Sequence, residues 1–375
     1  MRIAMISDCY PPHMGGIESQ VEGMARQLAL RGHHVEVVTA TPGPEGAVRG
    51  SDLARGTGRL EVTRAALNLP GFLPVNPFAG KQIARALGRC EVAHIHMGVV
   101  SPLALHALAI ATRRRVPTVV TFHCMLDGWS EIFKRAGIYH VEKSPVVLSA
   151  VSSTLAEQVK RVARVDDVLV IPNGVALSRW RHIAACRPMP PAPNTPLQLV
   201  TAMRFMPRKR PFALVATMRR VRDQLGPQCP HLAMFGEGAQ YSAVKTAIGA
   251  AGMGDLIECP GRKTESQLQM EYLHADAFVL PSKRESFGIA ALEARAAGLP
   301  VIAYRSTGTT DFLTDGLDSL LVGESGHLAD AIVRLVREPD LLKQLQTNAV
   351  EPTTLSWQTS IDAVFEAYDR ATRMG

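Results

Sequence analysis

Two glutamates, eight residues apart, form the sharpest chemical pattern in this sequence. Glu285 stands at the entrance of an expected helix, and Glu293 follows it on the same helix, about 12 Å along the axis. The free backbone N–H groups of this helix start, near Phe287 to Ile289, can hold a diphosphate, while the carboxylates accept hydrogen bonds from sugar hydroxyls. In the alternative interpretation, Glu285 is only an acid that the helix dipole favours.

A basic loop earlier in the chain offers the complementary charge. Arg204 and Lys209 follow one expected strand and precede a helix. A forked guanidinium and a compact ammonium suit a diphosphate, whose negative charge must be stabilised as it departs. A solvated basic loop is an equally consistent interpretation.

Two more loops follow expected strands in the same half of the chain. Gly236 lies in a Phe-Gly-Glu-Gly turn that could approach a nucleotide, although a plain turn is at least as consistent with the pattern. Arg262 and Lys263 follow the next strand and could line a pocket for the base, or could simply be exposed. Both loops are secondary candidates.

The first half of the chain contributes glycines and histidines. Gly15 and Gly16 form a turn before the first helix, where an anion can approach the backbone; a plain tight turn is the alternative. The turn lacks the spacing of a dinucleotide fingerprint and the lysine of a P-loop. His123 closes a strand, where it could hydrogen-bond a reacting sugar; a structural role is the alternative. His94 and His96 also end a strand, but no third residue at a supporting spacing predicts a metal site there.

The elements that position these residues alternate between strands and helices. β-branched runs predict the strands, and amphipathic stretches such as residues 16–31 predict the helices between them. Repeated strand–helix–strand units form parallel sheets, so the fold class is α/β with two doubly wound, Rossmann-like domains. The predicted strands are residues 2–7, 35–39, 92–96, 118–122, 146–152 and 168–171 in the first half, and 197–202, 231–235, 256–259, 277–280, 301–304 and 319–322 in the second.

A proline-dense stretch at residues 187–196 predicts the domain boundary, because it cannot join the interior of a sheet or a helix. The first domain is therefore expected at residues 1–186 and the second at residues 197–355. Residues 356–375 are expected to form a last helix, with packing on the first domain as one option. Open α/β sheets bind ligands beyond the carboxyl ends of their strands, so the site is expected in a cleft between the domains.

Composition narrows the class of protein. Apolar residues make up 46% and charged residues 20% of the 375 residues, as is typical of globular proteins. No apolar run approaches the roughly 20 residues that span a bilayer, and the start lacks a signal-peptide pattern, so we expect a cytoplasmic protein with reduced cysteines. The net charge of +7 favours an anionic partner. The scattered basic clusters lack the interleaved aromatic residues of a single-strand binder, so nucleic acid is not expected.

The order and spacing of these motifs resemble the retaining glycosyltransferases of family 4, which have the GT-B fold. The resemblance covers nearly the whole chain. It rests on Gly15-Gly16 before the first helix, His123 after a strand, Ile171-Pro-Asn-Gly174, Arg204 with Lys209, and Glu285-x7-Glu293. It implies a hexosyltransferase that takes a nucleotide diphosphate sugar as co-substrate and needs no other cofactor, with an acceptor-side first domain and a donor-binding second domain.

The resemblance also implies roles for single residues. Glu285 and the helix start would hold the sugar and phosphate, Glu293 would bind the ribose, and His123 would hydrogen-bond the donor sugar and help to stabilise charge at its anomeric centre. Residues 171–174 would serve the interdomain region structurally. The implied donor-binding set is Gly15, Gly16, Arg204, Lys209, Gly236, Arg262, Lys263, Glu285, Ser286, Phe287, Gly288, Ile289 and Glu293; the implied catalytic set is His123, Arg204, Lys209 and Glu285.

Family members retain the anomeric configuration, and in the favoured account the acceptor hydroxyl attacks from the side that the nucleotide leaves. The departing phosphate then takes the acceptor proton, so no protein base is required. Glycosidases place two carboxylates around the bond, but the axial distance between Glu285 and Glu293 argues against that assignment. Because the sequence contains no Asp-x-Asp metal signature, Arg204, Lys209 and helix N-termini are expected to replace a metal.

A weaker resemblance concerns the acceptor. Residues 15–19 and 121–123 are similar to enzymes that act on phosphatidylinositol, which makes GDP-mannose the first choice of donor, ahead of UDP-N-acetylglucosamine and UDP-glucose. The acceptor would be phosphatidylinositol-like or a glycolipid of the cell envelope, and residues 69–78 and 127–139 would face it. The alternative is a transferase that depends on UDP-N-acetylglucosamine or UDP-glucose and has a small-molecule acceptor. Lys134, Arg135 and the Arg113–Arg115 run could contact anionic lipid at the inner membrane surface; a solvated face is the alternative.

Other classes of protein make different demands on the sequence. A nucleotide-sugar epimerase on the same fold would need an acid–base set around one sugar and no acceptor site. A non-catalytic binder of sugar nucleotides is disfavoured because Arg204, Lys209, Glu285 and His123 are all present. A nicotinamide oxidoreductase is weaker still, since the first strand lacks the G-x-G-x-x-G turn.

Overall fold

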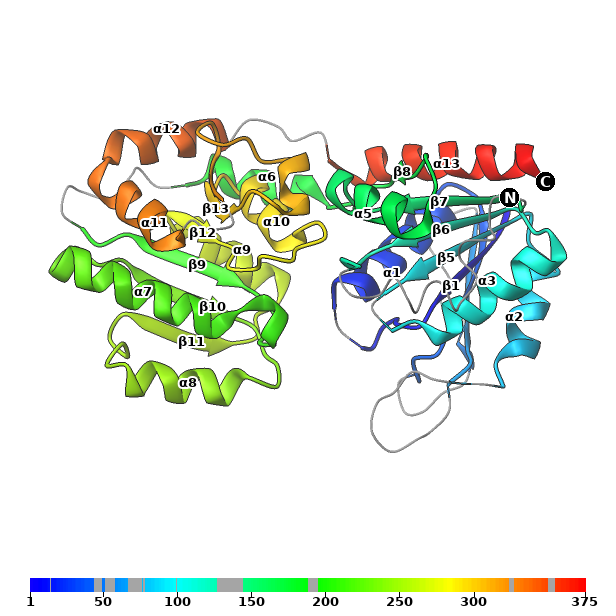
Figure 1. The fold of residues 1–375 in the computed structure, drawn as a ribbon, viewed down its shortest axis with the longest axis horizontal. Helices are drawn as coiled ribbons and strands as arrows, with labels where there is room; N and C mark the ends of the chain where they lie inside the picture. The colour runs from blue at the N-terminus through cyan, green and yellow to red at the C-terminus, as the bar shows by residue number, and fades with distance from the viewer. Residues whose placement is uncertain are drawn as a thin grey trace. The chain divides into compact units, whose positions relative to one another are not determined.

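The computed structural model describes residues 1–13, 15–43, 49–50, 58–66, 76, 78–98, 100–126, 144–187, 195–323, 327–349 and 355–375. The chain divides into two compact units. Unit 1 comprises residues 1–174 and 355–375, and unit 2 comprises residues 175–354. Each unit has its own sheet (Figure 1). Each also has its own cluster of buried hydrophobic residues.

The sheet of unit 1 has the strand order β3-β4-β2-β1-β5-β6-β7-β8. All its paired strands are parallel except β3, which pairs antiparallel with β4. The strands are β1 (Arg2–Ser7), β2 (His34–Thr39), β3 (Arg49–Gly50), β4 (Arg59–Arg64), β5 (Val92–Met97), β6 (Thr118–Phe122), β7 (Val146–Ala150) and β8 (Leu169–Val170). Because the strands are parallel, their carboxyl ends share one edge of the sheet.

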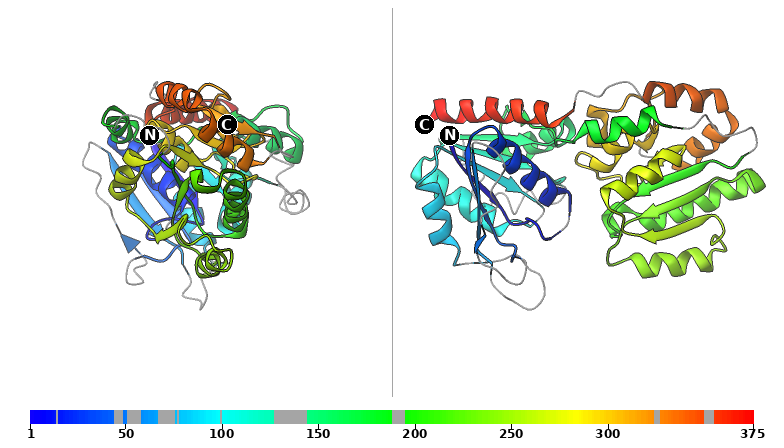
Figure 2. Two further views of the ribbon diagram at one scale, coloured as in Figure 1. Left: turned by 90° about the vertical axis from the view of Figure 1, so that its left-hand side faces the viewer. Right: turned by 180° about the vertical axis from the view of Figure 1, so that it is seen from behind.

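Helices cover this sheet because each presents an apolar face to it. The C-terminal helix α13 contacts α1 and the strands β5, β6 and β7, and its red ribbon lies beside the sheet in Figures 1 and 2. Ser356 begins α13 by accepting a hydrogen bond from the Thr359 N–H, as serine commonly does at a helix start. The helices of unit 1 are α1 (Gly16–Leu30), α2 (Gly80–Leu87), α3 (Pro102–Arg114), α5 (Ser153–Ala163) and α13 (Trp357–Met374).

The sheet of unit 2 is entirely parallel and has the order β11-β10-β9-β12-β13-β14. Its strands are β9 (Gln198–Ala202), β10 (His231–Phe235), β11 (Ile257–Gly261), β12 (Ala277–Val279), β13 (Val301–Tyr304) and β14 (Ser319–Val322). Its helices are α6 (Leu177–Ala185), α7 (Pro211–Leu225), α8 (Tyr241–Ala250), α9 (Glu265–His274), α10 (Ile289–Ala296), α11 (Leu328–Arg337) and α12 (Pro339–Ala349), with 3-10 turns η3 (Pro207–Lys209), η4 (Gly226–Gln228) and η5 (Gly308–Asp311).

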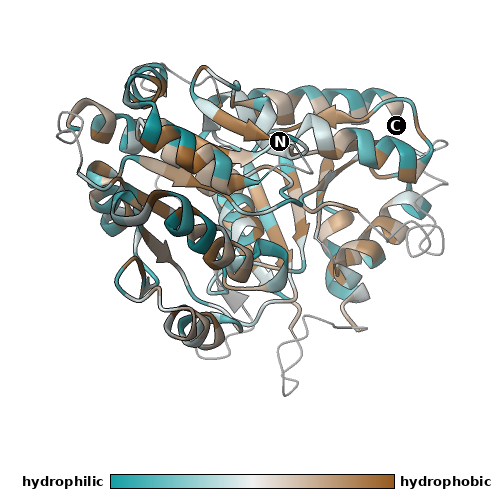
Figure 3. Ribbon diagram, turned by 60° about the vertical axis from the view of Figure 1, so that its left-hand side comes forward, coloured by the Kyte–Doolittle hydropathy of each residue, from teal (hydrophilic) through white to brown (hydrophobic). Residues whose placement is uncertain are grey.

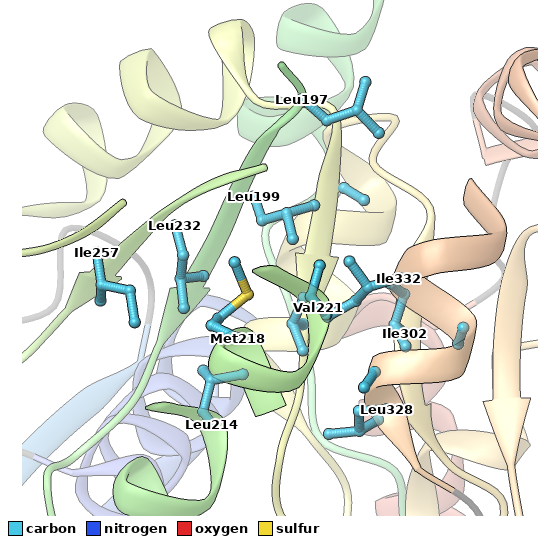
Figure 4. Packing of buried hydrophobic residues seen from close by; sticks show 14 of the residues in the cluster. Leu197, Leu199, Leu214, Met218, Val221, Leu232, Ile257, Ile302, Leu328 and Ile332 are labelled. Atoms are coloured by element: carbon cyan, nitrogen blue, oxygen red, sulfur yellow. The ribbon is translucent and has the colours of Figure 1, made fainter. Parts of the chain in front are cut away.

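The core of unit 2 lies between its sheet and the helices α7 and α11. Leu199 and Leu232 from the strands pack with Met218 and Val221 of α7 and with Ile332 of α11 (Figure 4). Colouring by hydropathy shows mainly hydrophobic strands and helices that carry both kinds of residue (Figure 3). Strands covered on both faces are expected to be apolar throughout, and this pattern made the strands visible in the sequence.

The structure confirms the predicted fold class. Each predicted strand is present to within two residues at either end. Only β3 and β4 were not predicted. In β4 the buried positions Leu60, Val62 and Arg64 alternate with more exposed ones, and the charged residues of the strand obscured this period of two.

The division of the chain differs from the boundary predicted at residues 187–196. Helix α6 belongs to unit 2, which begins at residue 175. The physical reason is the packing of Trp180, which is 1% exposed and whose ring lies 5.4 Å from that of Tyr272. Residues 188–194 of the predicted linker lie outside the described residues. The proline-dense stretch therefore follows a helix that is already part of unit 2.

Residues 171–174 end unit 1 and are held there by α1 and α13. The Gln20 side chain accepts a hydrogen bond from the Gly174 N–H (2.9 Å) and donates one to the Gly174 carbonyl (3.0 Å). A side chain at Gly174 would overlap the indole of Trp357. The segment thus fastens the end of unit 1 to both helices.

Candidate active site

The loops that follow β9 and β10 are joined along their backbones. The N–H of Met203 donates to the carbonyl of Phe235 (2.9 Å), and the N–H of Phe205 donates to the carbonyl of Glu237 (2.8 Å). Gly236 has a φ of 129°, and a Cβ atom there would overlap the Met203 carbonyl oxygen. Close backbone packing therefore requires Gly236, whatever it does at a nucleotide.

Lys209 and Glu285 meet although they are 76 residues apart in the chain. Lys209 ends η3 after β9, and Glu285 lies in the loop between β12 and α10. The Lys209 Nζ donates to the Glu285 Oε2 at 2.6 Å, and the two side chains are 22% and 9% exposed. An ammonium has three donors, so Lys209 can hold this carboxylate and still donate to a phosphate oxygen.

Arg210 strengthens the connection between these loops. It adopts a left-handed conformation with a φ of 57° immediately before α7. Its Nη1 donates to the Pro281 carbonyl (3.4 Å) and to the Tyr304 hydroxyl (3.3 Å), and its guanidinium lies 5.6 Å from the Tyr304 ring centre. The Lys283 ammonium lies 5.1 Å from the same ring. Sequence reasoning missed these two residues, because their shared contact with Tyr304 depends on folding.

At the start of α10, the backbone of Gly288 packs closely against Thr309. Gly288 has a φ of 92°, and a Cβ atom there would lie 2.6 Å from the Thr309 Cγ2. The helix has no side-chain cap, so its first backbone N–H groups, from Ile289 onward, have no intrahelical acceptor. Phe287 is buried, Ser286 is half-buried, and the Glu285 carbonyl accepts from the Gly308 N–H (2.8 Å). These N–H groups can therefore bind an anion beside Lys209.

Glu293 has a different environment from Glu285. Loss of hydration, and then the negative charge of Glu265, raises the pKa of Glu293 to about 8. Burial, and then the negative charge of Glu293, keep the pKa of the Tyr272 hydroxyl well above its usual value. A protonated carboxyl both donates and accepts hydrogen bonds, which suits it to a vicinal diol such as that of ribose.

Three other residues of unit 2 were predicted to bind the donor: Arg204, Arg262 and Lys263. Arg204 and Arg262 are exposed in the loops after β9 and β11. Lys263 pairs with Glu271 (3.0 Å) and lies 5.9 Å from the Phe235 ring centre. The structure thus unites Lys209, Glu285 and the start of α10, while Arg204 and Arg262 are exposed on two separate loops of the same sheet.

In unit 1, His123 is part of a buried group of three histidines. It follows β6, is 6% exposed, and its Nε2 lies 3.0 Å from the Nδ1 of His96. The ring of His96 stacks on that of His94 at 4.2 Å. Burial lowers the pKa of His123 to about 4 and that of His94 to about 3, so these imidazoles are neutral at pH 7. Sequence reasoning set His96 aside, although its alternation with His94 places both on one face of the sheet.

Gly15 and Gly16 begin α1, as predicted from the glycine turn, but a carboxylate already lies there. A side chain at Gly15 would overlap the Glu18 carboxylate. Glu18 is 5% exposed and its Oε1 lies 2.5 Å from the His13 Nδ1. The dipole of α1 therefore already has a negative partner, and a phosphate at Gly16 would have to lie beside it.

The described residues contain neither a cluster of metal ligands nor a helix that could cross a membrane. Among them, no group of three or more histidine, cysteine, aspartate or glutamate side chains is arranged to hold a metal ion. No helix in the described ranges has the length and apolar character that crossing a membrane requires. Residues 127–139, which were predicted to face the acceptor and include Lys134 and Arg135, lie outside the described residues, as do residues 69–75 and 77.

Comparison with known proteins covers almost the whole chain. Residues 14–179 match the family described as Glycosyltransferase Family 4, and residues 185–351 match the family described as Glycosyl transferases group 1. The D-inositol 3-phosphate glycosyltransferase of Arthrobacter sp. is 31% identical over 389 residues, which cover 95% of this chain and 90% of that protein. The GDP-mannose-dependent alpha-(1-6)-phosphatidylinositol monomannoside mannosyltransferase of Mycobacterium tuberculosis is 25% identical over 377 residues, with coverage of 95% and 94%.

Two solved structures with the same fold match nearly the whole chain. Sucrose-phosphate synthase from Thermosynechococcus elongatus superposes with a TM-score of 0.77 at 20% identity, covering 98% of each chain. HepE of Anabaena, in complex with UDP and glucose, superposes with a TM-score of 0.74 at 18% identity, again covering 98% of each chain. At these identities the similarity shows the GT-B fold alone.

Proposed function

Because this chain belongs to the family 4 glycosyltransferases, we propose that it moves a hexosyl group, with mannose favoured, from a nucleotide diphosphate sugar to a hydroxyl acceptor with retention of configuration. The observation that carries this proposal is the pairing of Lys209 with Glu285 beside the uncapped start of α10. A cation, a carboxylate and free N–H groups are together what a sugar diphosphate needs.

In this proposal, the donor diphosphate binds the ammonium of Lys209 and the N–H groups at the start of α10. Arg204 adds charge from the same loop as Lys209, and Glu285 accepts hydrogen bonds from the sugar. Glu293 binds the ribose hydroxyls, and Arg262 and Lys263 line the base. The remaining assignments, at Gly15, Gly16 and Gly236, are proposals that the donor approaches the backbone at these glycines.

The proposed reaction needs neither a metal nor a protein base. Lys209 and the start of α10 stabilise the charge that develops on the leaving diphosphate. The acceptor hydroxyl attacks from the side that the diphosphate leaves, and the departing phosphate oxygen takes its proton. His123 contributes a hydrogen bond to the donor sugar. Since burial keeps the pKa of His123 near 4, it acts in the neutral form.

The choice of donor and acceptor is supported by the names of similar proteins. The two relatives described above carry inositol in their names, and one of them uses GDP-mannose. We therefore propose GDP-mannose as donor and an inositol-containing lipid or glycolipid as acceptor. Residues Arg113 to Arg115 end α3 and are exposed, so they are proposed to contact anionic headgroups at the inner membrane surface.

A panel of donors tests the proposal directly. Thermal shifts would be measured with GDP, UDP and ADP sugars, because a ligand that binds the folded protein raises its melting temperature. GDP-mannose should give the largest shift, and transfer to inositol-containing acceptors should follow, with retention checked by NMR of the product. A larger shift with UDP-glucose or UDP-N-acetylglucosamine would overturn the donor choice. Conversion of the donor to its epimer without acceptor would instead favour a nucleotide-sugar epimerase.

A further inference from the structure

The three buried histidines of unit 1 form two hydrogen-bonded groups that differ in how fully they are satisfied. His94 uses both ring nitrogens: Nδ1 lies 2.9 Å from the Tyr368 hydroxyl and Nε2 lies 2.7 Å from the Thr121 hydroxyl. His96 uses only Nδ1, toward His123 at 3.0 Å. Within the described part of the chain, the buried Nε2 of His96 has no hydrogen-bond partner.

The proton positions around His94 follow from the end of its chain of hydrogen bonds. The Ser149 hydroxyl donates to the Val120 carbonyl (3.1 Å), so it must accept from the Thr121 hydroxyl at 2.7 Å. Thr121 must then accept from the Nε2–H of His94, whose Nδ1 accepts from Tyr368. The network thus fixes one neutral tautomer of His94.

The same reasoning leaves two choices for the pair of His96 and His123, because one nitrogen must donate across the 3.0 Å contact. If His123 donated, His96 would keep a buried Nε2–H without an acceptor. If His96 donates from Nδ1, its unpartnered Nε2 carries only a lone pair. Buried N–H groups without acceptors are rarer in proteins than unsatisfied acceptors, so the second arrangement is favoured.

We infer that His96 is a positioning residue: by donating from Nδ1 to the Nε2 of His123, it holds His123 in the tautomer whose proton is on Nδ1. His123 therefore presents an N–H donor, rather than a bare nitrogen, on the opposite side of its ring. That this donor meets the hydroxyls of a donor sugar rests on the proposed function; the tautomer itself does not.

His94 and its hydrogen-bond partners hold the ring of His96 in place. The His94 ring stacks on His96 with an interplanar angle of 23°, and His94 is itself fixed by Tyr368 of α13 and Thr121 of β6. His96 is 1% exposed and His94 is fully buried. The orientation of His123 is thereby connected, through two stacked rings, to the C-terminal helix.

The tautomer can be measured without any assay of function. In 1H–15N correlation spectra of the full chain labelled at histidine nitrogens, His123 should show a protonated Nδ1 and an unprotonated Nε2 at pH 7. A protonated Nε2 in His123 would overturn the inference, and would do so whether or not the protein transfers a sugar.

Two substitutions at His96 separate positioning from packing. His96→Asn keeps an N–H donor at the position of Nδ1, whereas His96→Leu fills similar space without a donor. With the best substrate pair of the donor panel, we expect His96→Leu to lower kcat about 10- to 100-fold with less than about a 3-fold change in donor KM, and His96→Asn to recover most of that loss.

Equal losses in the two variants would overturn the inference, since packing alone would then explain them; so would full activity in both. Melting curves establish that each variant is folded. If His96→Leu does not fold, the spectrum of the unmodified protein and the activity of His96→Asn still decide the matter. If no nucleotide sugar supports transfer, the proposed function fails, while the tautomer measurement stands by itself.

Discussion

The ends of the two sheets carry opposite kinds of polar group. In unit 2, the loops after β9 and β12 meet through charge: Lys209 binds Glu285, and Arg210 donates to the Pro281 carbonyl. In unit 1, the ends of β5 and β6 carry neutral imidazoles joined by a hydrogen bond, whereas the carboxylate of Glu18 lies at the start of α1, after β1. One fold thus supports two chemistries: the charged edge of unit 2 suits a diphosphate, and the neutral edge formed by the ends of β5 and β6 suits the hydroxyls of a sugar.

Removing the ammonium of Lys209 should have the largest effect on donor binding and activity. In Lys209→Ala the diphosphate loses its ammonium, and Glu285, 7% exposed, loses its ion-pair partner. We expect kcat/KM to fall about 100- to 1,000-fold and the thermal shift with donor to disappear. Lys343→Ala, which removes an exposed lysine of α12, is the control. A normal donor shift in Lys209→Ala would refute the assignment of the charged edge.

Gly236→Ala should disturb the same edge through the backbone. The new methyl group would overlap the Met203 carbonyl at a φ that only glycine adopts readily. We expect a loss of about 3 kcal/mol in the free energy of unfolding, together with weaker donor binding. Gly249→Ala lies in α8 with open space around its Cβ position and should stabilise by about 0.5–1 kcal/mol. Urea unfolding of the two variants measures the difference, and equal effects would show that the loop contact is dispensable.

The charged edge was largely predictable from the sequence, whereas the neutral one was not. Lys209 and Glu285 each follow a strand that β-branched residues identify, and the carboxyl ends of parallel strands share one edge. Their charges make both residues conspicuous. The role of His96 depends on the register between β5 and β6, which places it opposite Thr121 and therefore near His123. Periodicity gives the face of a strand but not its partner.

The extent of the units was also hidden from the sequence. The proline-dense stretch marks a break, but Trp180 attaches α6 to unit 2 before that break is reached. Strand β4 was missed because charged residues alternate with its buried ones. For α6, a tertiary contact and not local propensity decided the outcome.

Glu293 and the buried histidines should make stability respond to pH in opposite directions. The raised pKa of Glu293, about 8, means that the folded protein binds an extra proton between about pH 4.5 and 8, so its contribution to stability is lost as pH rises through that range. Because the pKa values of His94 and His123 are lowered, the folded protein loses stability as pH falls below about 6.5.

The variant Glu293→Gln tests the expected loss of stability at alkaline pH. At pH 9 we expect the variant to be more stable than the unmodified protein by about 2 kcal/mol, and at pH 5 to differ little, while donor binding weakens. Glu258→Gln, at an exposed position of β11, should leave the pH dependence unchanged. Urea unfolding at both pH values provides the measurement. An equal stability difference at pH 5 and pH 9 would contradict a raised pKa.

The smallest expected effect on stability comes from a comparison of two buried tyrosines, one in each unit. The Tyr368 hydroxyl donates to the His94 Nδ1 at 2.9 Å, whereas, among the described residues, the buried Tyr272 hydroxyl has no hydrogen-bond partner. Tyr368→Phe should therefore lower the free energy of unfolding by about 1 kcal/mol, because it leaves a buried acceptor unsatisfied, and Tyr272→Phe should be neutral or stabilising. Both changes remove one oxygen from a fully buried ring, so packing cancels between them. If Tyr272→Phe destabilises as much as Tyr368→Phe, the hydrogen bond from Tyr368 does not stabilise His94 and the histidines packed on it. The contrast between the two edges would then rest on charge alone.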